Sequence, residues 1–144
     1  MLLYGHDREL SLWAGQQLGF GCAIRTGAPP VAIGVALKGE IVAAAIYHDY
    51  RPPSIEVTFV TTTPRWASRS NIKAILHYPF VQLVCKRITA ITPEDNVQAR
   101  AFLERLGFQK EGVHPDVYKD NNMAGISYGL LRRDAERWLS NGQS

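Results

Sequence analysis

The sequence predicts one mixed α/β (α+β) domain over residues 1–144, with a mostly antiparallel sheet, a central parallel pair of strands and flanking helices. Apolar and charged residues make up 46% and 20% of the chain, fractions typical of a soluble globular protein. Two apolar β-type runs are joined by Lys38-Gly39-Glu40, a pattern typical of an antiparallel hairpin. Strands and helices then alternate, and this order favours parallel pairing in the middle of the chain.

The first half of the chain is predicted to contain one helix and three strands. Tyr4–Leu18 carries apolar residues at helical spacing, and Asp7 lies near a plausible start. Glycines and prolines between Gly19 and Pro30 then interrupt regular structure. The predicted strands are Val31–Leu37, Ile41–Tyr50 and Ile55–Thr63, the last of them ended by Pro64.

The second half is predicted to contain a helix, a strand, a second helix, two closing strands and a final short helix. Trp66–Cys85 has helical spacing, but Pro79 lacks a backbone N–H and must kink or split this helix. Asp95 or Asn96 caps the next helix, which ends at Gly107. The other predicted elements are strands at Ile88–Ile91, Phe108–Tyr118 and Met123–Leu131, and a short helix at Asp134–Leu139.

Charge and cysteine content narrow the class of protein. The net charge of +3 and the pI near 9.0 suit an anionic ligand, and they permit nucleic acid without implying it. Cys22 and Cys85 have neither metal-site nor redox spacing, and the histidines are too scattered to predict a metal site. The apolar runs are too short to span a bilayer, and the N-terminus does not resemble a signal peptide. We therefore expect a cytoplasmic monomer or homodimer with buried, reduced thiols and no membrane association.

The most specific pattern in the chain lies between Asp95 and Phe108. Asn96 stands at a helix start, an amphipathic helix ending in Leu-Glu-Arg-Leu follows, and Gly107-Phe108 then opens a strand that reaches Glu111-Gly112. This pattern resembles the second half of the GNAT acetyltransferases, which bind acetyl-coenzyme A. It is most similar to the subgroup of ribosomal-protein N-terminal acetyltransferases and to phage members of the superfamily. The resemblance implies a GNAT-like fold in which the central parallel strands splay apart.

The family resemblance also implies a pyrophosphate-binding loop between the third strand and the central helix. Such a loop directs backbone N–H groups and a helix N-terminus at the phosphates. The segment from Thr61 to Asn71 has this place but lacks the family's glycines, so a solvated basic turn is the alternative interpretation. By resemblance, Asn96 contacts the pantetheine arm. The residues expected to bind acetyl-coenzyme A are Val60, Thr61, Thr62, Arg65, Ser68, Arg69, Ser70, Asn96 and Arg100.

Amine acetylation needs a base, and the departing thiolate benefits from an acid. Glu56, among apolar neighbours on the third strand, is the candidate base, and a surface glutamate is the alternative interpretation. His48 and Asp49 end the preceding strand, and they would face the same cleft as Glu56 if the two strands pair. The alternative interpretation of His48 is an ordinary polar residue whose hydrogen bonds are satisfied. The family often has a tyrosine acid at the position matched by Leu103, which has no proton to donate. We therefore expect another hydroxyl to act instead, Tyr128 or Tyr118, and protonation by solvent is the alternative.

Three functions are consistent with these observations. The first is an acyl-CoA-dependent N-acetyltransferase that transfers acetyl from acetyl-coenzyme A to an amine by direct attack. The second is a non-catalytic module of the same fold that binds a partner, which the missing glycines and tyrosine would favour. The third is an enzyme that modifies nucleic-acid bases, as some phage members of the superfamily do. The sequence does not identify the acceptor.

Overall fold

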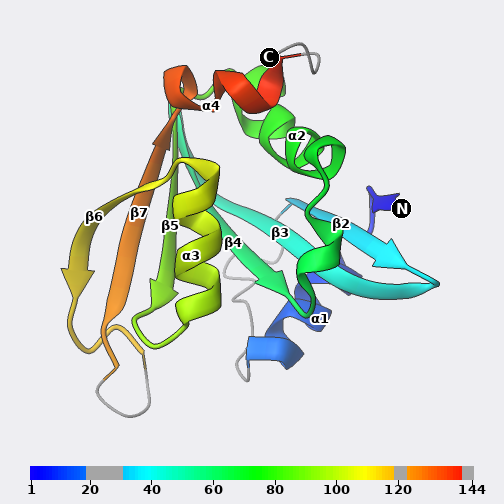
Figure 1. Ribbon diagram of the computed structural model, residues 1–144, viewed down its shortest axis with the longest axis horizontal. Coiled ribbons are helices and arrows are strands. Elements are labelled where there is room, and N and C mark those ends of the chain that lie inside the picture. The colour runs from blue at the N-terminus through cyan, green and yellow to red at the C-terminus, as the bar shows by residue number, and fades with distance from the viewer. Residues whose placement is uncertain (19–30, 119–122, 141–144) are drawn as a thin grey trace.

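A seven-stranded sheet runs through the part of the chain that the computed structural model describes, residues 1–18, 31–118 and 123–140. The strands follow the order β1-β2-β3-β4-β5-β7-β6 across the sheet, with helices on both faces (Figure 1). The predicted breaks between Gly19 and Pro30, and Cys22 with them, lie outside the described residues. The strands are β1 (Leu2–Leu3), β2 (Val31–Leu37), β3 (Glu40–Arg51), β4 (Ser54–Thr61), β5 (Arg87–Pro93), β6 (Gln109–His114) and β7 (Gly125–Leu131).

The strand pairing follows the predicted mixed pattern. Every neighbouring pair is antiparallel except β4 and β5, which run parallel. The β2–β3 hairpin turns at Lys38 and Gly39, both with positive φ (52° and 81°), the conformation that a tight two-residue hairpin turn requires. The mixed α/β class, the hairpin and the central parallel pair are therefore confirmed.

Two apolar cores lie on opposite faces of the sheet. The helices are α1 (Asp7–Leu18), α2 (Arg69–His77), α3 (Val97–Leu106) and α4 (Arg132–Leu139), with a short 3₁₀ helix, η1 (Pro64–Trp66), and a π-helical turn, η2 (Tyr78–Gln82). The larger core packs under α2, α3 and α4, and the smaller one packs under α1. Because side chains alternate along a strand, Ile55 and Val57 enter the larger core while Glu56 points to the opposite face. No helix in the described ranges is long and apolar enough to cross a bilayer.

Local sequence signals explain where the helices begin and end. Asn96 caps α3, its side-chain oxygen accepting from the backbone N–H of Ala99 at 3.1 Å. Gly107 ends α3 with a φ of 108°, which a residue with a β-carbon adopts only under strain. Pro79 lies in η2, directly after α2 ends at His77, so the predicted interruption is confirmed.

Several boundaries differ from the predicted ones. The helix expected from Trp66 begins only at Arg69, because Pro64 starts the 3₁₀ turn and Ser68 then caps α2. The strand expected over Phe108–Tyr118 ends at His114, and the last helix begins earlier, at Arg132. The two-residue strand β1 was not predicted, since so short a segment carries no periodicity. Cys85 is a free, buried thiol, as expected.

Candidate functional site

The parallel strands β4 and β5 part soon after they begin. They pair at three positions, from Ser54 with Arg87 to Glu56 with Thr89. No pair joins them beyond that point, although β4 continues to Thr61. Figure 1 shows the strands diverging toward their carboxyl ends, with α3 in front of them. The facing edges of β4 and β5 therefore carry backbone groups that neither strand uses to bind the other.

Aromatic side chains hold α3 over the diverging strands. Phe59, beyond the last paired position of β4, lies edge-to-face with Phe102 of α3, the two ring centres 5.8 Å apart. Phe108 meets Phe59 in the same way at 6.4 Å, and Trp66 of η1 lies 5.2 Å from Phe102. The loop after β4 and the helix α3 are thus fixed to one another through these rings.

Glu56 and His48 lie together at the point where the strands part. His48 pairs directly with Glu56 across β3 and β4, so the predicted meeting of these two residues is confirmed. The Glu56 carboxylate lies 3.5 Å from His48 Nδ1, and Asp49 Oδ2 lies 2.8 Å from the same nitrogen. A β-bulge after His48, with Asp49 at a φ of 52°, directs the Asp49 side chain to this cluster.

Thr58 completes the cluster, and sequence reasoning missed it. Its hydroxyl lies 3.0 Å from His48 Nε2, so both ring nitrogens of His48 have partners. Thr58 is two residues after Glu56 and therefore lies on the same face of β4, a strand periodicity that would have identified it. The side chains of His48, Asp49 and Glu56 remain 33%, 49% and 40% exposed, so a substrate can reach them.

The environment of Glu56 favours its protonated form. Burial is the largest cause of its raised pKa, and the Asp49 carboxylate adds to the effect. His48 acts in the opposite direction and lowers the pKa of Glu56, but more weakly than burial raises it. A carboxylate whose pKa is raised in this way is a stronger base when it ionises, which suits proton abstraction.

The loop expected to bind pyrophosphate has an ordered, hydrogen-bonded geometry. Thr63 caps η1 by accepting from the N–H of Arg65, and Ser68 caps α2 by accepting from the N–H of Asn71 at 3.2 Å. The hydroxyls of Ser68 and Ser70 lie 3.2 Å apart, both exposed. The loop thus presents a helix N-terminus with two exposed hydroxyls.

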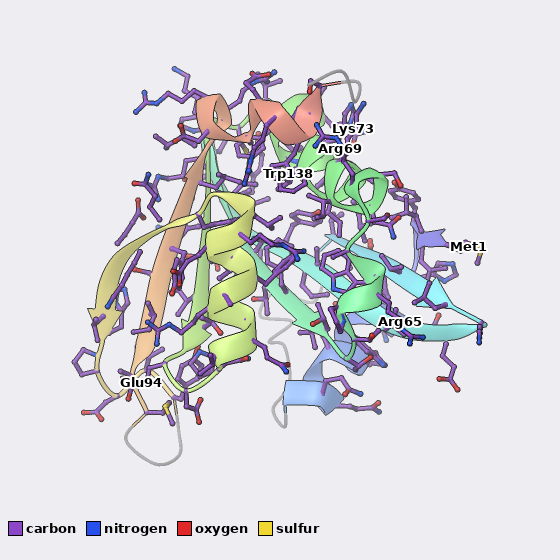
Figure 2. All side chains as sticks on the ribbon, viewed as in Figure 1. Met1, Arg65, Arg69, Lys73, Glu94 and Trp138 are labelled. Atoms are coloured by element: carbon purple, nitrogen blue, oxygen red, sulfur yellow. The ribbon has the colours of Figure 1, made fainter. Side chains whose placement is uncertain are left out.

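The two arginines of this loop point to different parts of the molecule. Figure 2 shows Arg65 low on the loop and Arg69 high, beside Trp138. The Arg69 guanidinium donates to the backbone carbonyl of Arg137 and lies 5.6 Å from the centre of the Trp138 ring. Arg69 therefore joins α2 to α4, whereas Arg65 is exposed on the loop.

The other predicted cofactor residues are placed as follows. The side chain of Val60 is buried on the α1 face, so only its backbone faces the diverging strands. Thr61 is exposed at the end of β4, while the backbone N–H of Thr62 donates to the carbonyl of Val42 at 2.9 Å. Asn96 is exposed at the start of α3, where its oxygen serves as the cap.

Tyr128 lies apart from Glu56 and His48. Its side chain is fully buried in the larger core, on the opposite face of the sheet. The hydroxyl donates to the Glu104 carboxylate at 3.2 Å and accepts from Arg100 Nε at 3.0 Å. The Arg100 guanidinium, from α3, also donates to the backbone carbonyl of Glu94. Leu103 is buried beside this network, 3% exposed.

Arg87 of β5 and Glu111 of β6 form a second polar cluster, on the same face of the sheet as Glu56. Arg87 binds the Glu111 carboxylate with both terminal nitrogens, one contact measuring 2.8 Å, and also donates to Thr89. The Glu111 side chain lies over Gly129, where a β-carbon would collide with the carboxylate. Sequence reasoning did not pair these residues, because they are 24 positions apart. They form a polar wall beside the diverging strands.

Comparison with known proteins identifies the fold. No family model and no curated protein matches the sequence. Among solved structures, a ribosomal-protein-alanine N-acetyltransferase from Brucella melitensis has a TM-score of 0.66 at 12% identity, covering 91% of this chain and 99% of that one. The ribosomal-protein-S18-alanine N-acetyltransferase from Escherichia coli has a TM-score of 0.64 at 17% identity, covering 91% and 92%. A GCN5-related N-acetyltransferase from Brucella melitensis has a TM-score of 0.62 at 20% identity, covering 78% and 58%.

The chain spans 58% to 65% of several solved acetyltransferases that it matches, and nearly the whole of the two ribosomal-protein enzymes. The likeness extends over one sheet with a parallel pair of strands and flanking helices. This chain therefore has the mixed α/β fold of the GNAT acetyltransferases, as its sequence predicted.

Proposed function

We propose that the protein is an N-acetyltransferase that moves an acetyl group from acetyl-coenzyme A to an amine by direct attack. The observation that carries this proposal is the position of Glu56. This carboxylate has a raised pKa, lies against His48 and Asp49, and stands at the last paired position before β4 and β5 diverge. The GNAT fold of the chain supports the same reaction class.

The diverging strands and the loop before α2 fit acetyl-coenzyme A as a substrate. Backbone groups between Val57 and Thr61 on the free edge of β4 would bind the pantetheine amides as an added strand does. The first turn of α2, the Ser68 and Ser70 hydroxyls and the Arg65 guanidinium would bind the phosphates. Bound in this way, the substrate supplies an activated acetyl thioester.

Glu56 would act as the base. It accepts a proton from the acceptor's ammonium group, and the freed amine nitrogen then forms a bond to the thioester carbonyl carbon. The nitrogen then loses its second proton to solvent, and the carbon–sulfur bond breaks as the amide forms, so that the sulfur departs as a thiolate. Leu103 offers no proton, and the Tyr128 hydroxyl is already donated to Glu104. We therefore infer that solvent protonates the thiolate, which is reasonable for a thiol with a pKa of about 8.5.

Binding of acetyl-coenzyme A tests the proposal. Acetyl-coenzyme A should raise the melting temperature, since a ligand that binds only the folded state stabilises it. Arg65→Ala should weaken binding about tenfold or more, the usual effect of losing a hydrogen bond to a charged group. Arg133→Ala, which removes an exposed arginine of α4, is the matched control and should bind like the wild type.

The thermal shift, together with transfer to a nucleobase and retention on DNA, also separates the proposed enzyme from the two alternative functions. No thermal shift at millimolar acetyl-coenzyme A would overturn the proposal and favour a binding module that only retains the fold. Acetyl transfer to a nucleobase, with retention on DNA that weakens as salt rises, would instead favour a nucleic-acid modifier.

A further inference from the structure

Three side chains of the kinds that bind metal ions converge where β4 and β5 begin to part. His48 Nδ1 lies 2.8 Å from Asp49 Oδ2 and 3.5 Å from Glu56 Oε2, and one ligand atom from each residue lies within 4.8 Å of the others. Bonds of about 2.0–2.2 Å to a tetrahedrally bound ion place neighbouring ligand atoms about 3.3–3.6 Å apart. Small rotations of the three side chains would therefore bring all three atoms to one ion.

The second ring nitrogen of His48 already has the kind of partner that metal-binding histidines have. Thr58 Oγ1 lies 3.0 Å from His48 Nε2. In the tautomer in which Nε2 donates its proton to this hydroxyl, Nδ1 keeps the lone pair that a metal ion binds, and the orientation of the ring is fixed. The contact with Thr58 therefore favours the form of His48 that binds an ion through Nδ1.

Charge and access also suit a cation at this cluster. Asp49 and Glu56 carry like charges when both are ionised, and a divalent ion bound between them neutralises both. Arg51, a nearby cation, lowers the pKa of Glu56, but less than His48 does. All three ligand side chains are partly exposed, so an ion can reach them and water or substrate can occupy a fourth position on the ion.

The donor atoms select the class of ion. One imidazole nitrogen with two carboxylate oxygens suits Zn²⁺ and the related divalent transition metals. Mg²⁺ and Ca²⁺ instead prefer six or more oxygen ligands. The scattered histidines predicted no metal site, whereas this cluster joins one histidine to two carboxylates from β3 and β4.

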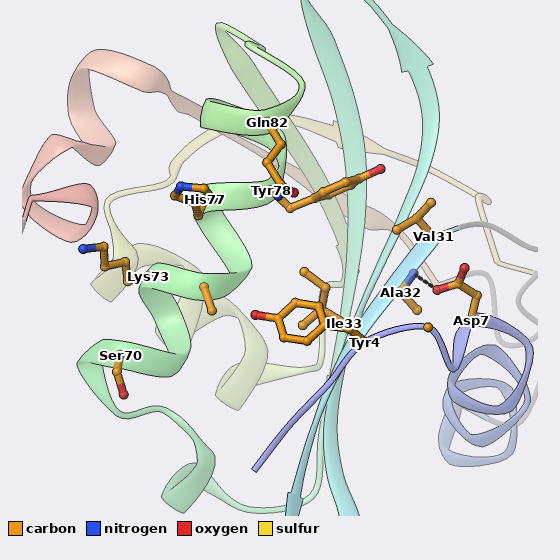
Figure 3. A pocket seen from close by; sticks show the side chains of 12 residues that line it. Tyr4, Asp7, Val31, Ala32, Ile33, Ser70, Lys73, His77, Tyr78 and Gln82 are labelled. Atoms are coloured by element: carbon orange, nitrogen blue, oxygen red, sulfur yellow. Dashed lines mark hydrogen bonds between the residues drawn. The ribbon is translucent and has the colours of Figure 1, made fainter.

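A pocket beside α2 also holds a histidine and a carboxylate, but it lacks this geometry. Its volume is about 520 Å³, and it is formed by the turn between β1 and α1, the start of β2, and α2 with η2 (Figure 3). His77 and Asp7 lie toward opposite sides of the pocket, and Lys73 lies on the same side of α2 as His77. Among the described residues, only the cluster at His48 offers three ligand atoms within 4.8 Å of one another. His77 is therefore a suitable control histidine.

We propose that His48, Asp49 and Glu56 bind a divalent transition-metal ion such as Zn²⁺, and that the bound ion prevents Glu56 from acting as a base. The carboxylate oxygen that binds the ion cannot take a proton from the amine at the same time. The cluster is therefore a reversible inhibitory metal site. Its effect on catalysis rests on the proposed acetyl transfer, whereas binding of the ion does not.

Calorimetry with Zn²⁺ and the metal-free protein tests the site without a catalytic readout. The wild type should bind one ion per chain at micromolar concentrations, and millimolar Mg²⁺ should not compete. Thr58→Val, which removes only the outer partner of the ring, should weaken binding about tenfold, and His48→Asn and Asp49→Asn should weaken it more. His77→Asn is the matched control and should bind like the wild type. No binding at micromolar Zn²⁺, binding that is unchanged in His48→Asn, or equal loss in His77→Asn would overturn the proposal.

Acetyl transfer with and without the ion separates this proposal from the proposed function. The rate is followed by the acetylated product, because Zn²⁺ also binds the released thiol. Zn²⁺ should inhibit the wild type, EDTA should restore the rate, and residual transfer by Asp49→Asn should resist the same concentration of ion. Binding of Zn²⁺ without inhibition would overturn the inhibitory role. Binding by a protein that transfers acetyl to no acceptor when metal-free would support the metal site while the acetyltransferase function fails, and transfer without Zn²⁺ binding would overturn the metal site alone.

Discussion

Replacing the proposed base, Glu56→Gln, should slow acetyl transfer by an amount that depends on the acceptor. Glutamine keeps the shape of the side chain next to His48 but cannot take a proton. An α-amino group has a pKa of about 7.7–8.0 and a lysine ε-amino group about 10.4. At pH 7 about one α-amine in six to ten is already unprotonated, whereas only about one lysine amine in 2,500 is.

If Glu56 only supplies unprotonated amine, the rate increase that it provides cannot exceed the inverse of the fraction of amine that is already unprotonated. Glu56→Gln should lower the rate at pH 7 about six- to tenfold for an N-terminal amine, and up to about 2,500-fold for a lysine amine. The first defect should vanish above about pH 8, and the second should persist to about pH 10. In the wild type the rate should fall as pH drops through the raised pKa of Glu56, because protonation removes the base.

Initial rates over this pH range measure both effects. The acceptors are a peptide with a free N-terminus and no lysine, and a peptide with a blocked N-terminus and one lysine. Glu136→Gln, an exposed glutamate of α4, provides the control and should leave the profile unchanged. If Glu56→Gln matched the wild type at pH 7 with the preferred acceptor, Glu56 would not be the base. His48, 3.5 Å from that carboxylate, would then be tested by the same profile in His48→Asn.

Three further predictions concern the scaffold. Gly34→Ala should cost about 1–3 kcal/mol of unfolding free energy in urea, because the added methyl overlaps the buried Leu10, and Leu10→Ala should partly relieve this cost. Glu111→Gln should cost less than about 1 kcal/mol at neutral pH, since the Glu111 carboxylate is partly exposed. Its pKa is lowered chiefly by the hydrogen bond from Arg87, so unfolding curves of mutant and wild type should converge as pH falls through that lowered pKa and the carboxylate protonates. Tyr128→Phe should lower stability by about 1–3 kcal/mol, while transfer at near wild-type rates would confirm that its hydroxyl is structural.

The parts of the fold that the sequence predicted depend on local signals. The Lys38-Gly39 turn, the Asn96 cap and Gly107 each act within a few residues, so their effects are visible in the sequence alone. The length of α2 was overestimated, because the apolar spacing continues through η2 although the backbone there has changed to a π-helical turn. The strand β1 was missed, since two residues gain their conformation only by pairing with β2.

The sequence predicted the part of the candidate site that depends only on the pairing of two consecutive strands. Glu56 and His48 required only that two consecutive strands form an antiparallel pair, and these strands do. The role of Arg69 depends on α4, which lies 68 residues away in the sequence, so its contact with Trp138 was beyond local reasoning. The pocket beside α2 is less predictable still, because it joins the turn before α1, the start of β2 and α2.

The two faces of the sheet have different surroundings, and they meet where β4 and β5 separate beyond Glu56. Glu56 and His48 lie on the face opposite α3, with Arg87 and Glu111 beside them, so the proposed amine acceptor would approach from that side. Leu103 and the Tyr128 network lie under α3, where the departing sulfur would be. A base and an acid on opposite faces can act on one carbonyl only where no strand pairing closes the sheet, and that is the point beyond Glu56. In this chain the base side is polar and reachable while the acid side is apolar or already hydrogen-bonded. In the reaction proposed above, proton abstraction from the amine, rather than protonation of the thiolate, is therefore the step that these side chains would assist.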